Sequence, residues 1–124
     1  MQDSQTTVMD LRKLIERFVQ QREWQTFHSP KNLAMSMAIE SAELMEHFQW
    51  LTVEQSRAVV DDPRKMTAIG EELADVLCYA LAMANALKLD IATVVHDKMS
   101  KNEQKYPPEE FRGRYGKEDI DRAG

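Results

Sequence analysis

The chain has 124 residues, with 16 basic and 21 acidic side chains and a net charge of −5. This length is typical of one domain with a substantial core, and the negative charge without a long basic run argues against a nucleic-acid partner. The single cysteine, Cys78, excludes an internal disulfide and suits a reducing compartment. There is no apolar leader and no run of about 18 apolar residues, so we expect a cytoplasmic protein without a membrane partner.

Helix start signals recur along the chain, each combining a capping side chain with a suitable first turn. The helix after the first signal keeps a 3.6-residue apolar period to about Arg22, and the second helix is expected to end near Trp50. No segment alternates like a strand, so the sequence predicts an all-α fold. The signals are Thr7 with Asp10, Ser29 with Pro30, Thr52 with Gln55, Asp62 with Pro63, and Asp90.

The fourth helix is expected to reach about Lys88, and the fifth to end before Pro107. Gly70 lies within the fourth helix, and we interpret it as a close crossing of another helix. Residues 1–107 therefore form one helical domain. Residues 108–124 carry glycines, many charges and few apolar side chains, which predicts a flexible C-terminal arm.

The expected helix at 30–50 is apolar over most of its circumference, with Glu40 and Glu43 on one narrow polar stripe. A helix of this kind is expected to be buried, and a buried carboxylate without a partner costs several kcal/mol. The next long helix carries a second acidic pair, Glu72 and Asp75, with Tyr79 on the same face. If the two helices pack face to face, four carboxylates meet, which predicts a cation site.

An all-oxygen site favours a hard cation, Mg²⁺ first and Mn²⁺ second. Neither acidic helix has a glutamate three residues before a histidine, which argues against a di-iron centre. Four carboxylates and a triphosphate repel each other unless divalent ions lie between them, and such ions activate water and phosphoryl groups. Acidic pairs at this spacing are also common on solvated helix faces; the apolar surroundings of both pairs favour the metal site.

Other candidate residues are ambiguous on their own. Rings at the ends of the helix at 30–50 form either a slot for a base or part of the core, and lysines on the last helix form either a phosphate contact or a solvated face. The two long helices carry more apolar residues than a single helix–helix contact can cover, which predicts an oligomer. The rings are Trp24, Phe27, His28 and Trp50; the last-helix residues are Lys98, Lys101, Lys105 and Asn102; the excess apolar residues are Met35, Ile39, Met45, Leu77, Leu81 and Leu87.

Taken together, these segments resemble the MazG-like nucleotide pyrophosphohydrolases, the all-α NTP pyrophosphatases, and within them the dCTP pyrophosphatase branch. The resemblance covers about residues 8–107. One position departs from it, because some members that prefer dCTP carry a histidine where Ile15 stands, which leaves base preference open. The matching motifs are Glu23-Trp24-x-x-Phe27-His28-x-Pro30-x-Asn32-Leu33, Glu40-x-x-Glu43, Phe48-Gln49-Trp50, Glu71-Glu72-Leu73-x-Asp75-Val76-Leu77, and Lys98-Met99 with Asn102 and Tyr106-Pro107.

The resemblance implies a four-helix-bundle-like fold, assembled as a homotetramer, a dimer of dimers. It implies Mg²⁺-dependent hydrolysis of a dNTP, dCTP favoured, to dNMP and pyrophosphate, as nucleotide-pool house-cleaning. The alternative is a non-catalytic helical oligomer that binds nucleotides or a protein partner, but a scaffold has no reason to bury acids. By resemblance, Glu40, Glu43, Glu72 and Asp75 bind metal, Glu40 or Glu43 orients the attacking water, Trp24, His28, Trp50 and Tyr79 contact base and sugar, and Lys98 and Asn102 contact phosphates.

Overall fold

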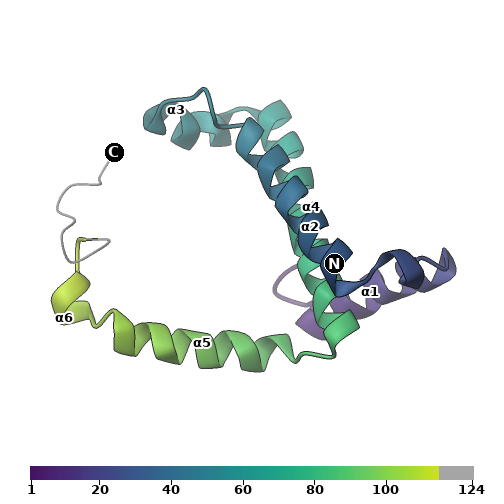
Figure 1. The fold of residues 1–124 in the computed structure, drawn as a ribbon. Helices are drawn as coiled ribbons and strands as arrows, with labels where there is room; N and C mark the ends of the chain where they lie inside the picture. Colours follow the sequence, from purple (N-terminus) through teal and green to yellow (C-terminus); the bar gives the residue numbers. More distant parts are fainter. Residues whose placement is uncertain (115–124) are drawn as a thin grey trace. The chain divides into compact units, whose positions relative to one another are not determined.

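A computed structural model describes residues 1–114 as helices joined by short turns, without a strand in that range (Figure 1). The all-α prediction is therefore confirmed for this part of the chain. The chain divides into two compact units, Met1–Leu89 and a second that begins at Asp90. The first unit holds α1 (Val8–Gln21), η1 (Gln25–Phe27), α2 (Pro30–Glu46), α3 (Val53–Arg57), η2 (Ala58–Asp61) and α4 (Pro63–Leu87), and the second holds α5 (Ile91–Lys105) and α6 (Pro108–Phe111).

Two of the helices begin with a reciprocal capping box. The backbone N–H of Asp10 donates to the Thr7 hydroxyl over 3.0 Å, and the N–H of Thr7 donates to the Asp10 carboxylate over 2.9 Å. Thr52 and Gln55 repeat this exchange at the start of α3, over 3.1 and 2.9 Å. A cap of this kind contributes about 1 kcal/mol, and both predicted helix starts are confirmed.

The two long helices begin with a single cap followed by proline at the first helical position. Ser29 accepts from the N–H of Asn32 over 3.2 Å at the start of α2. Asp62 accepts from the N–H groups of Arg64 and Lys65, over 3.1 and 3.2 Å, at the start of α4. Both predicted starts are confirmed. Proline is tolerated there because it lacks an N–H, and an N–H at the first helical position would have no partner within the helix.

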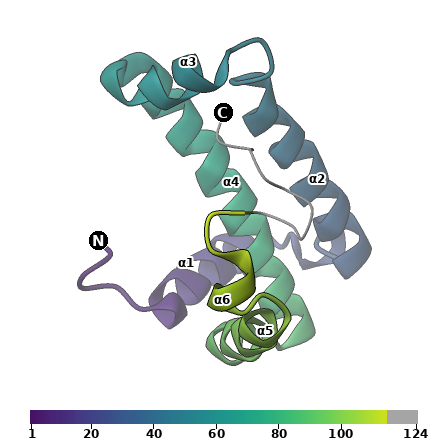
Figure 2. The same ribbon diagram turned by 90° about the vertical axis from the view of Figure 1, so that its left-hand side faces the viewer.

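The centre of the first unit is a helical hairpin, in which α2 and α4 lie side by side and α3 with η2 joins them at one end (Figures 1 and 2). The chain reverses its direction between residues 47 and 62, so the two long helices run antiparallel and their acidic pairs approach each other. Leu33 near the start of α2 is 1% exposed and Leu81 near the end of α4 is 5% exposed, so these side chains belong to the buried core of the first unit.

A polar tie fixes α1 against the C-terminal end of α4. Arg12 donates from Nε to the Asn85 side-chain oxygen over 2.9 Å and from Nη1 to the Leu89 carbonyl over 2.7 Å. Asn85 returns a bond from its amide nitrogen to the Arg12 carbonyl over 3.1 Å. Because hydrogen bonds with a charged donor are among the stronger ones, this tie sets how α1 lies on α4.

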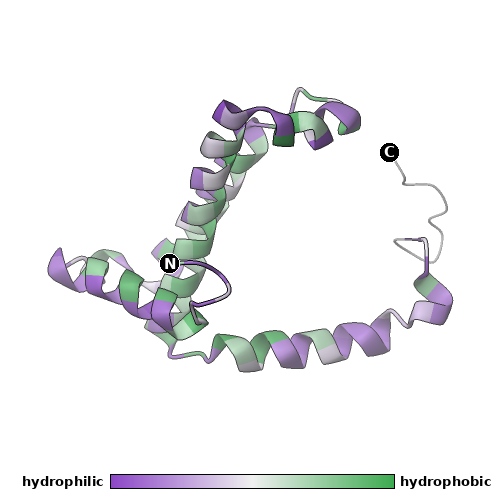
Figure 3. Cartoon of the chain, turned by 180° about the vertical axis from the view of Figure 1, so that it is seen from behind, coloured by the Kyte–Doolittle hydropathy of each residue, from purple (hydrophilic) through white to green (hydrophobic). Residues whose placement is uncertain are grey.

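The burial expected for the apolar helices is not found within one chain. Met35, Ile39 and Met45 of α2 are 52%, 57% and 60% exposed, and apolar residues extend over much of α2 and α4 (Figure 3). The reason is geometric, because each helix turns only one stripe toward its partner in the hairpin and leaves the opposite face uncovered.

Two further details differ from expectation. α2 ends at Glu46, and residues 47–50 form turns, so the helix does not reach Trp50. Gly70 continues the helical backbone of α4, and a Cβ atom placed on it would meet nothing within 4 Å. The interpretation of Gly70 as a close crossing is therefore wrong within the described part of this chain.

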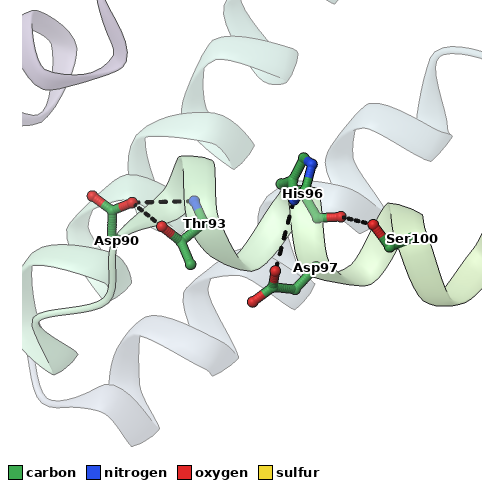
Figure 4. Close-up of polar contacts among 5 residues, drawn as sticks. All are labelled: Asp90, Thr93, His96, Asp97 and Ser100. Atoms are coloured by element: carbon green, nitrogen blue, oxygen red, sulfur yellow. Dashed lines mark hydrogen bonds and ion pairs between the residues drawn. The ribbon is translucent and has the colours of Figure 1, made fainter.

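The second unit begins with the predicted cap at Asp90. Its carboxylate accepts from the N–H of Thr93 over 3.1 Å and from the Thr93 hydroxyl over 2.6 Å (Figure 4). Further along α5, the Ser100 hydroxyl donates to the His96 carbonyl over 3.1 Å. These bonds are local, since each joins residues three or four positions apart.

The chain after α5 is partly ordered where a flexible arm was expected. Residues 108–111 form the short helix α6, and the rings of Tyr106 and Phe111 meet edge to face with centroids 5.1 Å apart. Residues 115–124 of the expected arm lie outside the described residues, and the domain boundary at residue 107 stays a prediction. No single helix of residues 1–114 is long and apolar enough to cross a membrane; only α4 and α5 taken together pass that test.

Candidate metal centre

Three carboxylates from two helices converge in the first unit. Glu40 and Glu43 lie one turn apart on α2, and the antiparallel packing of α4 brings Glu72 to them. One carboxylate oxygen from each residue lies within 4.8 Å of the other two. These oxygens are close enough to share one cation, and they are the ligand type that Mg²⁺ takes.

Two of these carboxylates are only half exposed, and each buries one oxygen. While both groups are ionised, Oε2 of Glu40 and Oε2 of Glu72 have no hydrogen-bond partner among the described residues. A buried acceptor left unpaired is costly, and a charged one more so. Either a proton or a cation relieves that cost, so the donor set fits a divalent metal ion.

The electrostatics of Glu40 reflect the same crowding. Hydrogen bonding with Glu43 raises the pKa of Glu40 most, followed by burial, hydrogen bonding with Glu72, and the negative charges of Glu43 and Asp75. Together they raise its pKa from 4.5 to about 7. In the absence of metal the cluster therefore retains a proton close to neutral pH.

The fourth predicted ligand, Asp75, lies at the edge of this group. It is not among the three residues whose oxygens lie within 4.8 Å, but its charge contributes to the raised pKa of Glu40. Burial, and then the charge of Asp75, raise the pKa of the Cys78 thiol. At neutral pH the cysteine is therefore a thiol rather than a nucleophilic thiolate, although its side chain is exposed in the single chain.

The aromatic candidates do not form one slot within the chain. The His28 and Tyr79 rings lie together, with centroids 6.4 Å apart and a tilt of 43°. Trp24 instead meets Phe18 edge to face at 5.7 Å. Trp50 is 86% exposed, because the chain has already left α2 in a turn.

The remaining predicted contacts, Lys98 and Asn102, belong to α5 in the second unit. Within that helix, the amide nitrogen of Asn102 lies 3.7 Å from the sulfur of Met99. The phosphate role of both residues stays a prediction.

A recess of about 240 Å³ lies between α1, η1 and α4, and the sequence interpretation missed most of it. His28 is part of its wall, and it is the only member predicted as a site residue. One feature of the sequence does point to the other lining residues, because Asn85 is the single polar side chain in the apolar run from 81 to 87. Its lining includes Ile15, Val19, Gln25, His28, Ala82 and Asn85.

Known proteins place this arrangement in a family. Residues 35–117 match the model of the MazG-like family. A dCTP pyrophosphatase 1 from Bos taurus is 37% identical over 110 residues, which are 89% of this chain and 65% of the relative. The dCTP pyrophosphatase 1 from Homo sapiens is 39% identical over 101 residues, which are 82% of this chain and 59% of the relative. The chain thus spans less than two thirds of the length of these relatives. A solved pyrophosphatase from Archaeoglobus fulgidus is 36% identical and superposes with a TM-score of 0.76, covering 86% of this chain and 98% of that one. The chain belongs to the MazG-like family.

Proposed function

We propose that this chain is a nucleoside triphosphate pyrophosphohydrolase that converts a dNTP, dCTP favoured, to dNMP and pyrophosphate. The observation that carries the proposal is the convergence of Glu40, Glu43 and Glu72, with two buried oxygens whose negative charge a cation would offset. The relatives named dCTP pyrophosphatase 1 support the reaction class and the favoured base. We also propose that the protein acts in the cytoplasm, where it removes unwanted nucleotides from the pool.

Glu40, Glu43, Glu72 and Asp75 hold Mg²⁺ in this proposal, with Mn²⁺ as a substitute. When bound, the ion neutralises phosphate charge and polarises the phosphoryl group. The proton that Glu40 retains near neutral pH must leave first, because carboxylate ligands bind metal in the deprotonated form. Glu40 or Glu43 then orients the attacking water.

The bond cleaved is the one between the α-phosphorus and the bridging oxygen to the β-phosphate. Water adds to the α-phosphorus, pyrophosphate leaves with the bridging oxygen, and a proton is released. Trp24, His28, Trp50 and Tyr79 contact the base and sugar, and Lys98 with Asn102 contacts the phosphates. The paired rings of His28 and Tyr79 support the first set, since bases stack on such rings.

The active form in this proposal is a homotetramer, built as a dimer of dimers. The exposed apolar residues of the two long helices support assembly, for example Ile39 at 57% and Leu77 at 50% exposure, because large apolar patches on soluble chains usually mark interfaces. Light scattering coupled to gel filtration tests the assembly, and a monomer at micromolar concentration would contradict it.

The test of the reaction is a survey of the common ribo- and deoxyribonucleoside triphosphates, with Mg²⁺ and with EDTA, in which pyrophosphate and monophosphate are both measured. We expect monophosphate and pyrophosphate in equal amounts with Mg²⁺ and no turnover with EDTA. Release of orthophosphate and diphosphate would mean that the wrong bond was chosen. Nucleotide binding without any turnover would favour the rival function, a non-catalytic helical oligomer.

A further inference from the structure

We infer that Arg12 is a positioning residue for substrate binding: its tie to Asn85 and the Leu89 carbonyl holds α1 on α4, and α1 in turn places the His28 ring. The inference rests on the proposed function, in which His28 contacts the base and sugar, and it adds Arg12 and Asn85 to that function. Three features of the first unit carry the argument: the attachment of α1, the bonding of the connector to His28, and the separate origin of the carboxylates.

Two anchors on one face of α1 hold it against α4 (Figures 1 and 2). Val19 is the buried residue of α1, and Arg12 lies seven residues earlier, which is almost two full turns and about 10 Å along the helix. A helix attached at Val19 alone can pivot about that point, and the tie at Arg12 removes this freedom. Four other large apolar side chains of α1 are close to half exposed and fix it less: Val8, Met9, Leu14 and Phe18.

The tie is reciprocal and partly shielded from water. Its bonds are those from Arg12 Nε to the Asn85 oxygen, from Arg12 Nη1 to the Leu89 carbonyl, and from the Asn85 amide nitrogen to the Arg12 carbonyl. A guanidinium presents its donors in a fixed planar fork, so two acceptors at once define its orientation. Loss of the Arg12 side chain removes two of the three bonds, and loss of the Asn85 side chain also removes two.

The connector between α1 and His28 is hydrogen-bonded to the end of α1, so the two move together. The backbone N–H of Trp24 donates to the Val19 carbonyl over 3.0 Å, and the N–H of Phe27 donates to the Trp24 carbonyl over 2.9 Å. On the far side, the Asn32 side chain donates to the Phe27 carbonyl over 3.2 Å. A tilt of α1 is therefore transmitted to His28.

The partner of the His28 ring belongs to the helix that also holds the tie. Tyr79 lies on α4, and its ring centroid is 6.4 Å from that of His28. Asn85 lies six residues further along the same helix. Because one rigid helix carries both Tyr79 and the acceptors of Arg12, the tie fixes the distance between the two rings.

The carboxylate cluster does not depend on α1. Glu40, Glu43 and Glu72 belong to α2 and α4, and α1 contributes none of the three. Release of α1 at Arg12 therefore moves the His28 ring and leaves the metal ligands in place. A change that weakens binding of the substrate and of the transition state alike raises KM and leaves kcat unchanged. This is the kinetic signature expected from loss of the tie.

The experiment compares Arg12→Met, Asn85→Leu and their double variant in the full chain with Mg²⁺, on the dNTP that the wild type hydrolyses best. We expect each single change to raise KM by about tenfold, with kcat within about twofold of the wild type. The double variant should raise KM by less than the product of the two single effects, because both changes break one tie. Arg17→Met is the matched control, since Arg17 is an exposed arginine of the same helix, and it should keep the wild-type KM. Multiplying single effects, or a fall in kcat without a rise in KM, would overturn the inference.

Two conservative variants keep the test decisive if Arg12→Met or Asn85→Leu fails to fold. Asn85→Asp keeps an acceptor for the Arg12 guanidinium and should therefore raise KM far less than Asn85→Leu. Arg12→Lys keeps the charge but lacks the planar fork, so its KM should lie between those of the wild type and Arg12→Met. An Asn85→Asp variant as impaired as Asn85→Leu would show that the contact with Arg12 is not what matters.

Hydrogen exchange followed by mass spectrometry separates this inference from the proposed function, because it needs no substrate. We expect Arg12→Met to speed exchange of the backbone amides of residues 8–21 and to leave those of α2 unchanged, since amides of a released element open locally. Unchanged exchange in α1, or an equal rise in both helices, would overturn the inference. A wild-type chain that releases no pyrophosphate would overturn the proposed function, while the exchange measurement would still test the hold of Arg12 on α1.

Discussion

Glu40 of α2 and Glu72 of α4 each bury a carboxylate oxygen that has no hydrogen-bond donor within residues 1–114. Their helices are neighbours in space, and a third carboxylate, Glu43, lies within reach of both. Such a group is stable only when a proton or a cation offsets its charge. The metal-free and metal-bound states of the protein should therefore differ measurably.

We expect Mg²⁺ to raise the melting temperature of the wild type, because a ligand bound only by the native state stabilises it, by about 2.7 kcal/mol at 100 times its dissociation constant. Glu72→Gln should lose most of this increase. Glu71→Gln is the matched control, since Glu71 is the exposed neighbour on the same helix. Differential scanning fluorimetry with and without EDTA makes the measurement, and equal melting temperatures in all conditions would contradict a metal site.

The stability of the metal-free protein should depend on pH in a particular direction. The pKa of Glu40 is raised to about 7 in the folded protein from an ordinary 4.5. A raised pKa means that the folded state holds this proton more tightly than the unfolded state. The stability that this proton contributes is thus fully present below the pKa of Glu40 in the unfolded chain, and it is lost as pH rises through the pKa of Glu40 in the folded protein. The melting temperature in EDTA should fall between about pH 5 and pH 8.

The variant Glu40→Gln tests the origin of this effect, because it removes the titrating group and should flatten that part of the profile. Saturating Mg²⁺ should also flatten it, since the bound ion replaces the proton. If the wild-type and Glu40→Gln profiles have the same slope in EDTA, another group is responsible.

Turnover should require the individual carboxylates. We expect Glu43→Gln and Asp75→Asn to lower kcat by about a thousandfold or more, because a misplaced ion loses several kcal/mol of charge stabilisation in the transition state. Removing one of the crowded negative charges should leave the melting temperature of the metal-free protein unchanged or raise it. Circular dichroism melting and pyrophosphate release are the two readouts, with Glu46→Gln at the end of α2 as control. Active variants with wild-type metal dependence would refute the ligand assignment.

A change at Gly70 should stabilise the protein. The position is exposed in mid-helix, and an added Cβ atom meets nothing within 4 Å. Gly70→Ala should therefore add about 1 kcal/mol to the free energy of unfolding, the difference in helix propensity. Urea denaturation measures it; a loss of stability would instead reveal that another copy of the chain packs closely there.

Local signals explain what the sequence predicted well. The side chains of Thr7, Thr52 and Asp62 accept from backbone N–H groups two or three residues away, so their role is readable from spacing alone. The meeting of Glu40 with Glu72 was also predictable, since each acidic pair marks one face of a helix whose remaining surface is apolar. In contrast, α2 ends at Glu46 without a glycine or proline to announce it.

The recess was not predictable, because its walls come together only through contacts distant in the chain. Ile15 and Ala82 both line the recess, and Arg12 beside it reaches Asn85, but no spacing rule links those residues. Sequence patterns show which residues share a face of a helix, but not which face another helix covers.

The Arg12–Asn85 tie spans 73 residues of chain, whereas the hairpin that gathers the carboxylates is closed by residues 47–62 alone. Short loops cost less entropy to close, and contacts of low sequence separation form early in folding. The carboxylate cluster can thus assemble before α1 docks, and the recess is completed last. Amino-acid changes on α1 can then shift or loosen this helix while the hairpin keeps its carboxylates in place.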